Sequence, residues 1–208
     1  MLSLQIATVF FGASVLLGLS PGPDNLFVLM QSATHGHRAG ILVVLGLCTG
    51  LLGHTAAVAL GLAAVVATSA IAFTVLKFVG AAYLLYLAWS AWRAPAAQAS
   101  GAVLQPQSGS SLYWRGVLMN LSNPKVALFF LAFLPQFVQP RQGPVVWQTI
   151  QLGAIFMLAT LLTFGAISFF AASIGNWLRQ SAQAQTWMNR GSAVLFAGLA
   201  VRLAISQR

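Results

Sequence analysis

Acidic side chains are almost absent from this sequence. Asp24 is the only aspartate or glutamate among 208 residues, against ten lysines and arginines. Acid–base catalysis by a carboxylate pair and metal binding by an acidic cluster both need more than one such group. The sequence also shows no pairing of a nucleophile with a base. An enzyme therefore ranks third among the function classes that we consider, and we expect no cofactor.

Cysteine and histidine are scarce as well. Cys48 is the single cysteine, so it has no partner for an internal disulfide and no second thiol for a metal site. His35 and His37 lie two residues apart in a polar turn, with no carboxylate or thiol nearby to complete a metal site. A metal or ion permease should line its path with several such ligands. A permease of this kind is therefore the second-ranked alternative.

Charge of either sign is rare, which excludes a soluble domain. Only 5% of the residues are charged and 59% are hydrophobic, with a mean hydropathy of +0.85. Such a chain lacks the polar surface that a soluble protein needs in water. The composition therefore predicts an integral membrane protein. The net charge of +9 comes from basic residues that mostly flank apolar runs, where they meet lipid headgroups. We therefore expect membrane lipids as partners and no nucleic acid.

Long apolar runs account for most of the chain. The first has no basic segment before it and no evident cleavage site, so we interpret it as a retained helix rather than a signal peptide. A polar stretch at 95–112 divides the chain into a first half at 1–94 and a second at 113–208. The runs are long enough to cross a bilayer, and they predict six membrane helices at 4–33, 40–67, 71–92, 113–138, 147–175 and 188–206.

Two of the predicted helices are interrupted by proline. Proline removes a backbone donor and clashes with the preceding turn, so the first helix should stop near Ser20, and a second half-helix should run over 24–33 with Pro23 suited to its first turn. Asp24 or Asn25 is expected to cap the restarted half. The fourth helix carries a similar interruption at Asn123-Pro124-Lys125. Each of these segments is predicted to be one broken helix rather than two separate spans.

The two interruptions coincide when the sequence is shifted by 102 residues without gaps. The shift aligns seven residues in each half: Val15, Leu16, Leu19, Ser20, Leu26, Phe27 and Leu29 with Val117, Leu118, Leu121, Ser122, Leu128, Phe129 and Leu131. An odd number of crossings per repeat places the halves in opposite orientations. We therefore expect an all-α membrane protein with six transmembrane helices in two inverted three-helix repeats.

Loop charges give an orientation. The positive-inside rule places the loops after helices one, three and five in the cytoplasm and both termini outside. The predicted cytoplasmic loops carry Arg38, Arg93, Arg115, Arg179 and Arg190, and the other side carries Arg141, Arg202 and Arg208.

The breaks also hold the residues that predict a binding site. An ionised side chain at membrane depth costs about 2.5 to 3.5 kcal/mol, so Asp24 and Lys125 should face a cavity or a partner. They could pair with each other or hold opposite ends of a zwitterion such as an amino acid. The structural alternatives are that Asp24 caps a helix and that Lys125 reaches toward a headgroup. Asn25 and Asn123 are expected to bind backbone groups that the breaks leave free.

His54 lies within the second predicted membrane helix. A hydrogen-bonded packing role is the first interpretation, and a proton relay is the second. His54 is therefore the secondary candidate for proton binding, after Asp24.

Four segments together resemble a known family. SPGPDNLFVL, HGHRAG, LKFVGAAYLLYLAW and NPKVALFFLAFLPQF are similar to the lysine exporter superfamily, in its threonine, homoserine and leucine efflux branch. The resemblance implies a multi-pass cytoplasmic-membrane exporter of neutral amino acids or related metabolites, driven by the proton motive force. The resemblance does not identify the substrate, and it is compatible with a homo-oligomer as well as a monomer. The motif positions of the family fall on Pro21, Gly22, Pro23, Asp24, Asn25, Asn123, Pro124 and Lys125.

Overall fold

The computed structural model describes residues 2–20, 22–68, 70–93, 107–171 and 182–205, and these residues contain helices and no strand. Most of these segments are predominantly apolar, and their backbone hydrogen bonds close within helices, as a bilayer requires. The longer helices are α1 Leu4–Leu19, α2 Pro23–His35, α3 His37–Thr68, α4 Ala70–Arg93, α5 Gly109–Ser122, α7 Val145–Phe169 and α9 Ala182–Ile205. The shorter elements are α6 Pro124–Leu128, the π-helix η1 Phe129–Phe133, and the 3₁₀ helices η2 Leu134–Phe137 and η3 Pro140–Gln142.

Both predicted breaks are confirmed. α1 ends at Leu19 and α2 begins at Pro23, with an angle of 65° between the two helices. α5 ends at Ser122 and α6 begins at Pro124, and here the chain bends by 49°. Each proline occupies the first turn of its helix, where its missing N–H costs no hydrogen bond. Pro21 lies outside the described residues.

Four predicted boundaries are wrong by several residues. The fifth predicted helix, α7, ends at Phe169 rather than at 175. α3 begins at His37 rather than at 40, because Gly36 adopts φ +85° and makes the turn almost alone. α5 begins at Gly109, within the predicted linker, after Ser108 accepts a hydrogen bond from the backbone N–H of Ser111. α9 begins at Ala182, within the predicted loop, because alternating alanine and glutamine form helix readily.

The described helices include candidate membrane spans of adequate length and hydropathy. Residues His37–Gly61 and Val145–Phe169 each reach a mean hydropathy of 2.0, and each bent pair passes the same test when it is counted as one span. The described part of the chain thus holds two to four candidate spans. Many large apolar side chains are exposed on them, as a lipid environment allows.

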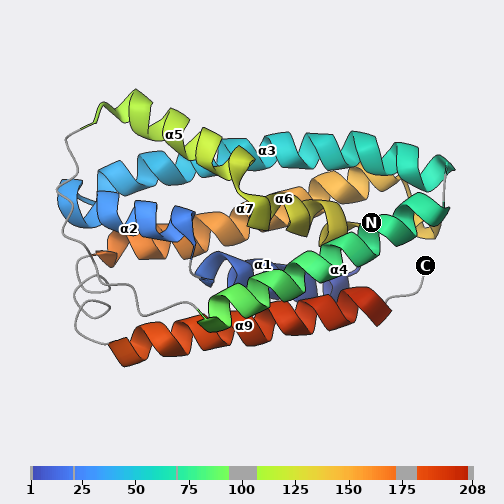
Figure 1. The fold of residues 1–208 in the computed structure, drawn as a ribbon. Coiled ribbons are helices and arrows are strands. Elements are labelled where there is room, and N and C mark those ends of the chain that lie inside the picture. The colour runs from blue at the N-terminus through green and yellow to red at the C-terminus, as the bar shows by residue number, and fades with distance from the viewer. Residues whose placement is uncertain (1, 21, 69, 94–106, 172–181, 206–208) are drawn as a thin grey trace.

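The helices pack as antiparallel pairs (Figure 1). α3 lies against α7 and runs in the opposite direction, and α4 and α9 form a second antiparallel pair. α3 also packs on α5, while α7 packs on α1 and α2. The α1–α2 segment runs opposite to the α5–α6 segment in Figure 1.

Small residues of α3 allow α5 to approach closely, because glycines at three- and four-residue steps share one face of a helix. A Cβ atom at Gly50 would lie 2.7 Å from the Cβ of Asn120, and one at Gly53 would lie 3.0 Å from Leu121. Gly46 faces the α5 backbone in the same way. Gly61, later in the same helix, has no atom within 4 Å of an added Cβ and takes no part in this contact.

Two apolar clusters form the interior. The first, the aromatic cluster, contains Phe10, Phe129, Phe133, Phe137 and Phe156, with neighbouring ring centroids 4.8 to 5.7 Å apart. The second, the α2–α3 cluster, contains Phe27, Val28, Val43, Leu47 and Phe164. Residues of both clusters line the pocket described next, so apolar packing encloses it from two directions.

Candidate functional site

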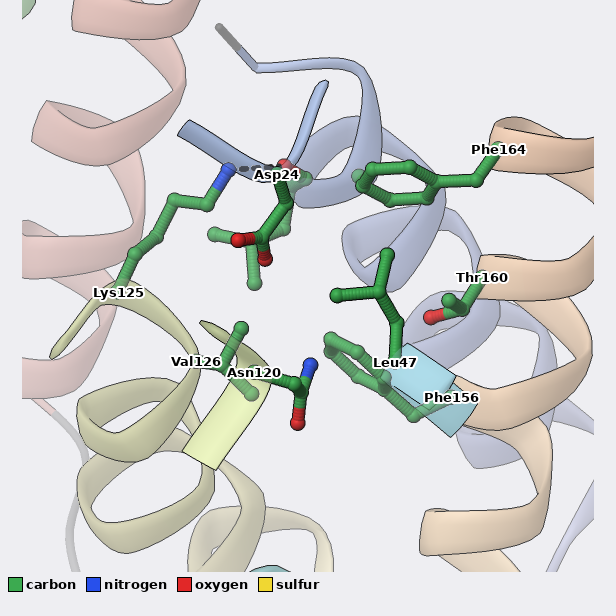
Figure 2. Close-up of a pocket in the computed structure, with 10 residues that line it drawn as sticks. Asp24, Leu47, Asn120, Lys125, Val126, Phe156, Thr160 and Phe164 are labelled. Carbon is green, nitrogen blue, oxygen red and sulfur yellow. Dashed lines mark hydrogen bonds between the residues drawn. The ribbon is translucent and has the colours of Figure 1, made fainter. Parts of the chain in front are cut away.

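Asp24 and Lys125 are buried in one pocket at the meeting point of the two broken helices (Figure 2). Their side chains are 3% and 9% exposed. The pocket is lined by Leu17, Gly18, Asp24, Leu47, Asn120, Lys125, Val126, Phe156, Thr160 and Phe164. Its volume of about 20 Å³ admits one or two water molecules and is too small for an amino acid. The pocket is therefore closed to an amino acid in this structure.

Asp24 is bound through one of its two carboxylate oxygens. Oδ2 accepts a hydrogen bond of 2.6 Å from the side-chain nitrogen of Asn123. Oδ1 is buried and has no hydrogen-bond partner. The carboxylate lies in the first turn of α2, where the helix dipole favours a negative charge. One acceptor oxygen is thus free at the centre of the pocket in Figure 2.

Lys125 reaches across to the end of α1. Its ammonium group donates to the carbonyl oxygens of Leu17, at 3.2 Å, and Ser20, at 3.1 Å. Both carbonyls belong to the C-terminal end of α1, and the carbonyl of Leu17 also accepts from the backbone N–H of Ser20 at 3.2 Å. A positive charge at a helix C-terminus is favourable. A Cβ atom at Gly22 would lie 3.2 Å from the ammonium nitrogen, so glycine leaves room for it.

The position of Lys125 bears on two of the sequence-based alternatives: a reach toward a lipid headgroup and direct pairing with Asp24. The side chain is buried in the protein, so the interpretation that it reaches toward a headgroup is wrong. Asp24 and Lys125 do not bind each other directly, because each is held by other groups: Asp24 by Asn123, and Lys125 by the α1 carbonyls. The remaining sequence-based interpretation is that they serve opposite ends of a zwitterion.

The two asparagines bind backbone at the breaks, as predicted. The side-chain oxygen of Asn123 accepts from the backbone N–H of Lys125 at 2.9 Å and caps α6. The side-chain nitrogen of Asn25 donates to the carbonyl of Gly18 at 2.6 Å. Asn25 therefore connects α2 back to α1 and does not cap α2. The expected cap by Asp24 or Asn25 is wrong, because Gly22 is the N-cap and no side chain completes it.

The histidines lie outside this pocket. Nε2 of His54 is 3.1 Å from the carbonyl oxygen of Asn120, and the His54 ring lies 5.6 Å from that of Phe130, which fits the packing interpretation. His35 contacts the hydroxyl of Thr34, and His37 stacks on Phe169. The described residues contain no group of three or more histidine, cysteine or acidic side chains that could hold a metal.

Three of the buried polar residues escaped the sequence reasoning. Asn120 and Thr160 line the pocket, and Gln31 is fully buried with neither side-chain amide atom partnered. Asn120 stands three residues before the second break, and that spacing is a signal that could have identified it. Thr160 and Gln31 sit in helices with no local irregularity, so nothing in their surroundings distinguishes them.

Comparison with known proteins shows what this architecture is similar to. The chain is 34% identical over 183 residues to a homoserine/homoserine lactone efflux protein of Salmonella typhimurium, covering 88% of each chain. It is 30% identical to an uncharacterized membrane protein of Vibrio cholerae, covering 99% and 100%, and 29% identical to a leucine efflux protein of Enterobacter, covering 97% and 95%. No solved structure matches it.

The family comparison covers both breaks and the pocket between them. The LysE type translocator family matches residues 15–207, which include every described residue that lines the pocket. The resemblance seen in the sequence motifs is thereby confirmed. The chain belongs to the LysE type translocator family.

Proposed function

We propose that this protein exports neutral amino acids, of the threonine, homoserine and leucine kind, across the cytoplasmic membrane in exchange for protons. The observation that carries the proposal is the pocket in which a lone carboxylate keeps one oxygen free beside a buried ammonium group. The efflux proteins named among its relatives support the substrate class.

The chemistry of the pocket suits a zwitterion. The free Oδ1 of Asp24 is an acceptor for a substrate ammonium group, and it is equally an acceptor for a proton. Both ligands neutralise the same carboxylate, so they exclude each other. The positive charge of Lys125 favours the substrate carboxylate in the same pocket. Exchange of a proton for an amino acid then requires only that the pocket face each side of the membrane in turn.

Six membrane helices in two inverted repeats are part of this proposal. The opposite directions of α1–α2 and α5–α6, of α3 and α7, and of α4 and α9 support it (Figure 1). The packing of α3 on α5 is matched by the packing of α7 on α1.

The pocket provides separate support for the repeats. The shift of 102 residues places Gly18 on Asn120 and Asp24 on Val126, and all four residues line the pocket. A binding site on the axis between two repeats has this composition. Because the closed pocket is too small for an amino acid, the repeats must move apart for substrate to enter.

A transport assay tests the function. Purified protein in proteoliposomes should exchange labelled threonine, homoserine or leucine for the unlabelled amino acid, and protein-free vesicles should not. A divalent-metal panel in the same vesicles covers the permease alternative. Uptake of a metal without any amino-acid exchange would refute the proposal. In cells, making the protein should lower the retained amount of a supplied amino acid.

A further inference from the structure

Asn120 presents its side chain to the pocket from the last turn of α5. The residue is 3% exposed, and its side-chain oxygen has no hydrogen-bond partner. In Figure 2 its side-chain nitrogen points toward the space occupied by the Asp24 carboxylate. The carboxylate lies between this nitrogen and the Lys125 ammonium group in that view. A hydrogen-bond donor therefore faces the same space as the free acceptor oxygen of Asp24.

Two residues of α3 hold Asn120 in this position. Nε2 of His54 lies 3.1 Å from its carbonyl oxygen, which also accepts from the backbone N–H of Asn123 at 3.0 Å. Gly50, four residues before His54, lies directly beneath the side chain, and a Cβ atom there would be 2.8 Å from the Asn120 side-chain oxygen. Asn120 is thus fixed by its backbone and by the absence of a side chain at Gly50.

The first half of the chain has no equivalent donor. The 102-residue shift aligns Asn120 with Gly18, which has no side chain, and aligns Ala127 with Asn25. The two aligned carbonyls are nevertheless both bound by side chains: that of Gly18 by Asn25, and that of Asn120 by His54. His54 thus supplies in the second half the contact that Asn25 supplies in the first. The second half of the chain therefore contributes the Asn120 amide to the pocket, and the first half contributes the Asp24 carboxylate.

We propose that Asn120 binds the substrate carboxylate through its side-chain amide and that His54 is a positioning residue for it. The inference rests on the proposed function. An α-amino acid carries its ammonium and carboxylate groups on one carbon, so its site needs an acceptor and a donor facing one space. Asp24 and Asn120 are such a pair. Lys125, whose ammonium group donates to the end of α1, contributes its positive charge and stabilises the break between α1 and α2.

The test compares each amino acid with its carboxamide. Proteoliposomes exchange whichever of leucine, threonine or homoserine the wild type transports, and the unlabelled amino acid or its amide competes. Asn120→Ala should weaken competition by the amino acid by about tenfold to a hundredfold, the range for a hydrogen bond to a charged group, and weaken competition by the amide less, because a neutral carbonyl accepts a weaker bond. Asn120→Asp, which places a negative charge beside the substrate carboxylate, should weaken competition by the amino acid further. Leu118→Ala, on an exposed face of the same helix, is the control.

His54 has its own readout. His54→Ala should reproduce the selective loss seen in Asn120→Ala, and His54→Gln, which keeps a donor near the Nε2 position, should restore it. The role of Asn120 is overturned if the Asn120 variants weaken competition by the amino acid and by the amide equally. This reading requires that the elution profile of the purified protein is unchanged. Failure of the wild type to exchange any amino acid overturns the proposed function as well.

Discussion

Replacing Asp24 by asparagine removes the only acidic side chain and changes little else. The carboxylate is bound by the Asn123 side-chain nitrogen at 2.6 Å, and the new amide oxygen can accept the same bond. What is lost is the charge-assisted part of that bond, about 1 kcal/mol. A membrane protein of this size should tolerate such a loss and remain folded. The variant therefore tests titration at Asp24 rather than folding.

The expected effect on coupled transport is much larger. If one proton moves against each amino acid, a difference of two pH units drives about a hundredfold concentration ratio. A variant whose side chain at residue 24 binds no proton cannot use that gradient, so its ratio should stay near one. Exchange of labelled for unlabelled substrate needs no gradient, and it should persist to the extent that the neutral amide still accepts a bond from the substrate ammonium group.

The assay measures both activities in the same vesicles. Proteoliposomes with an imposed pH difference report accumulation, and vesicles without one report exchange. Leu26→Ala serves as the control, since Leu26 lies two residues away on α2 and is 49% exposed. Accumulation by Asp24→Asn at the level of the control would refute a coupling role for Asp24. His54 would then be the next residue to replace.

Three further predictions concern packing and buried polar groups, each measured as thermal unfolding of the purified protein. Gly50→Val should lower stability by about 1 to 3 kcal/mol, because its side chain meets Asn120, whereas Gly61→Ala should be neutral or stabilising; equal effects would contradict the α3–α5 contact. Lys125→Met should cost about 3 kcal/mol, since two carbonyls at the end of α1 lose a charged donor, and an unchanged melting temperature would show that water replaces it. Gln31→Leu should raise stability by about 1 to 3 kcal/mol, because both atoms of its buried amide lack partners, and a lower melting temperature would reveal a bond that forms in solution.

The sequence predicts the breaks well because proline acts locally. Pro23 and Pro124 each fix the start of a helix without help from the rest of the fold, and both starts are where the residues indicate. The errors at Gly36 and Ala182 have a different origin. The polar residues around Gly36 suggest a longer turn than the one that this glycine makes. The alanine–glutamine repeat at 182–185 has low hydropathy, but both residue types form helix readily.

The walls of the pocket could not be predicted in the same way. Leu47, Phe156 and Phe164 come from unbroken apolar helices, in which each leucine or phenylalanine resembles its neighbours in the sequence. The repeat alignment places Asp24 and Lys125 near each other, and they do line one pocket. It does not indicate which groups they bind, because those bonds depend on how far the side chains reach across the break.

The hydrogen bonds of Asn123 link the Asp24 carboxylate to helix α6. Asn123 binds the Asp24 carboxylate with its nitrogen and the first turn of α6 with its oxygen, so it joins α2 to α6 across 99 residues of sequence. α6 continues without interruption into the π-helix that carries Phe129 and Phe133, and these rings pack in the aromatic cluster on one side of the pocket. Any ligand that neutralises Asp24 weakens its bond to Asn123, because that bond is strongest to a full negative charge. The carboxylate proposed to bind the substrate and the aromatic rings of η1 are therefore linked through Asn123 and α6.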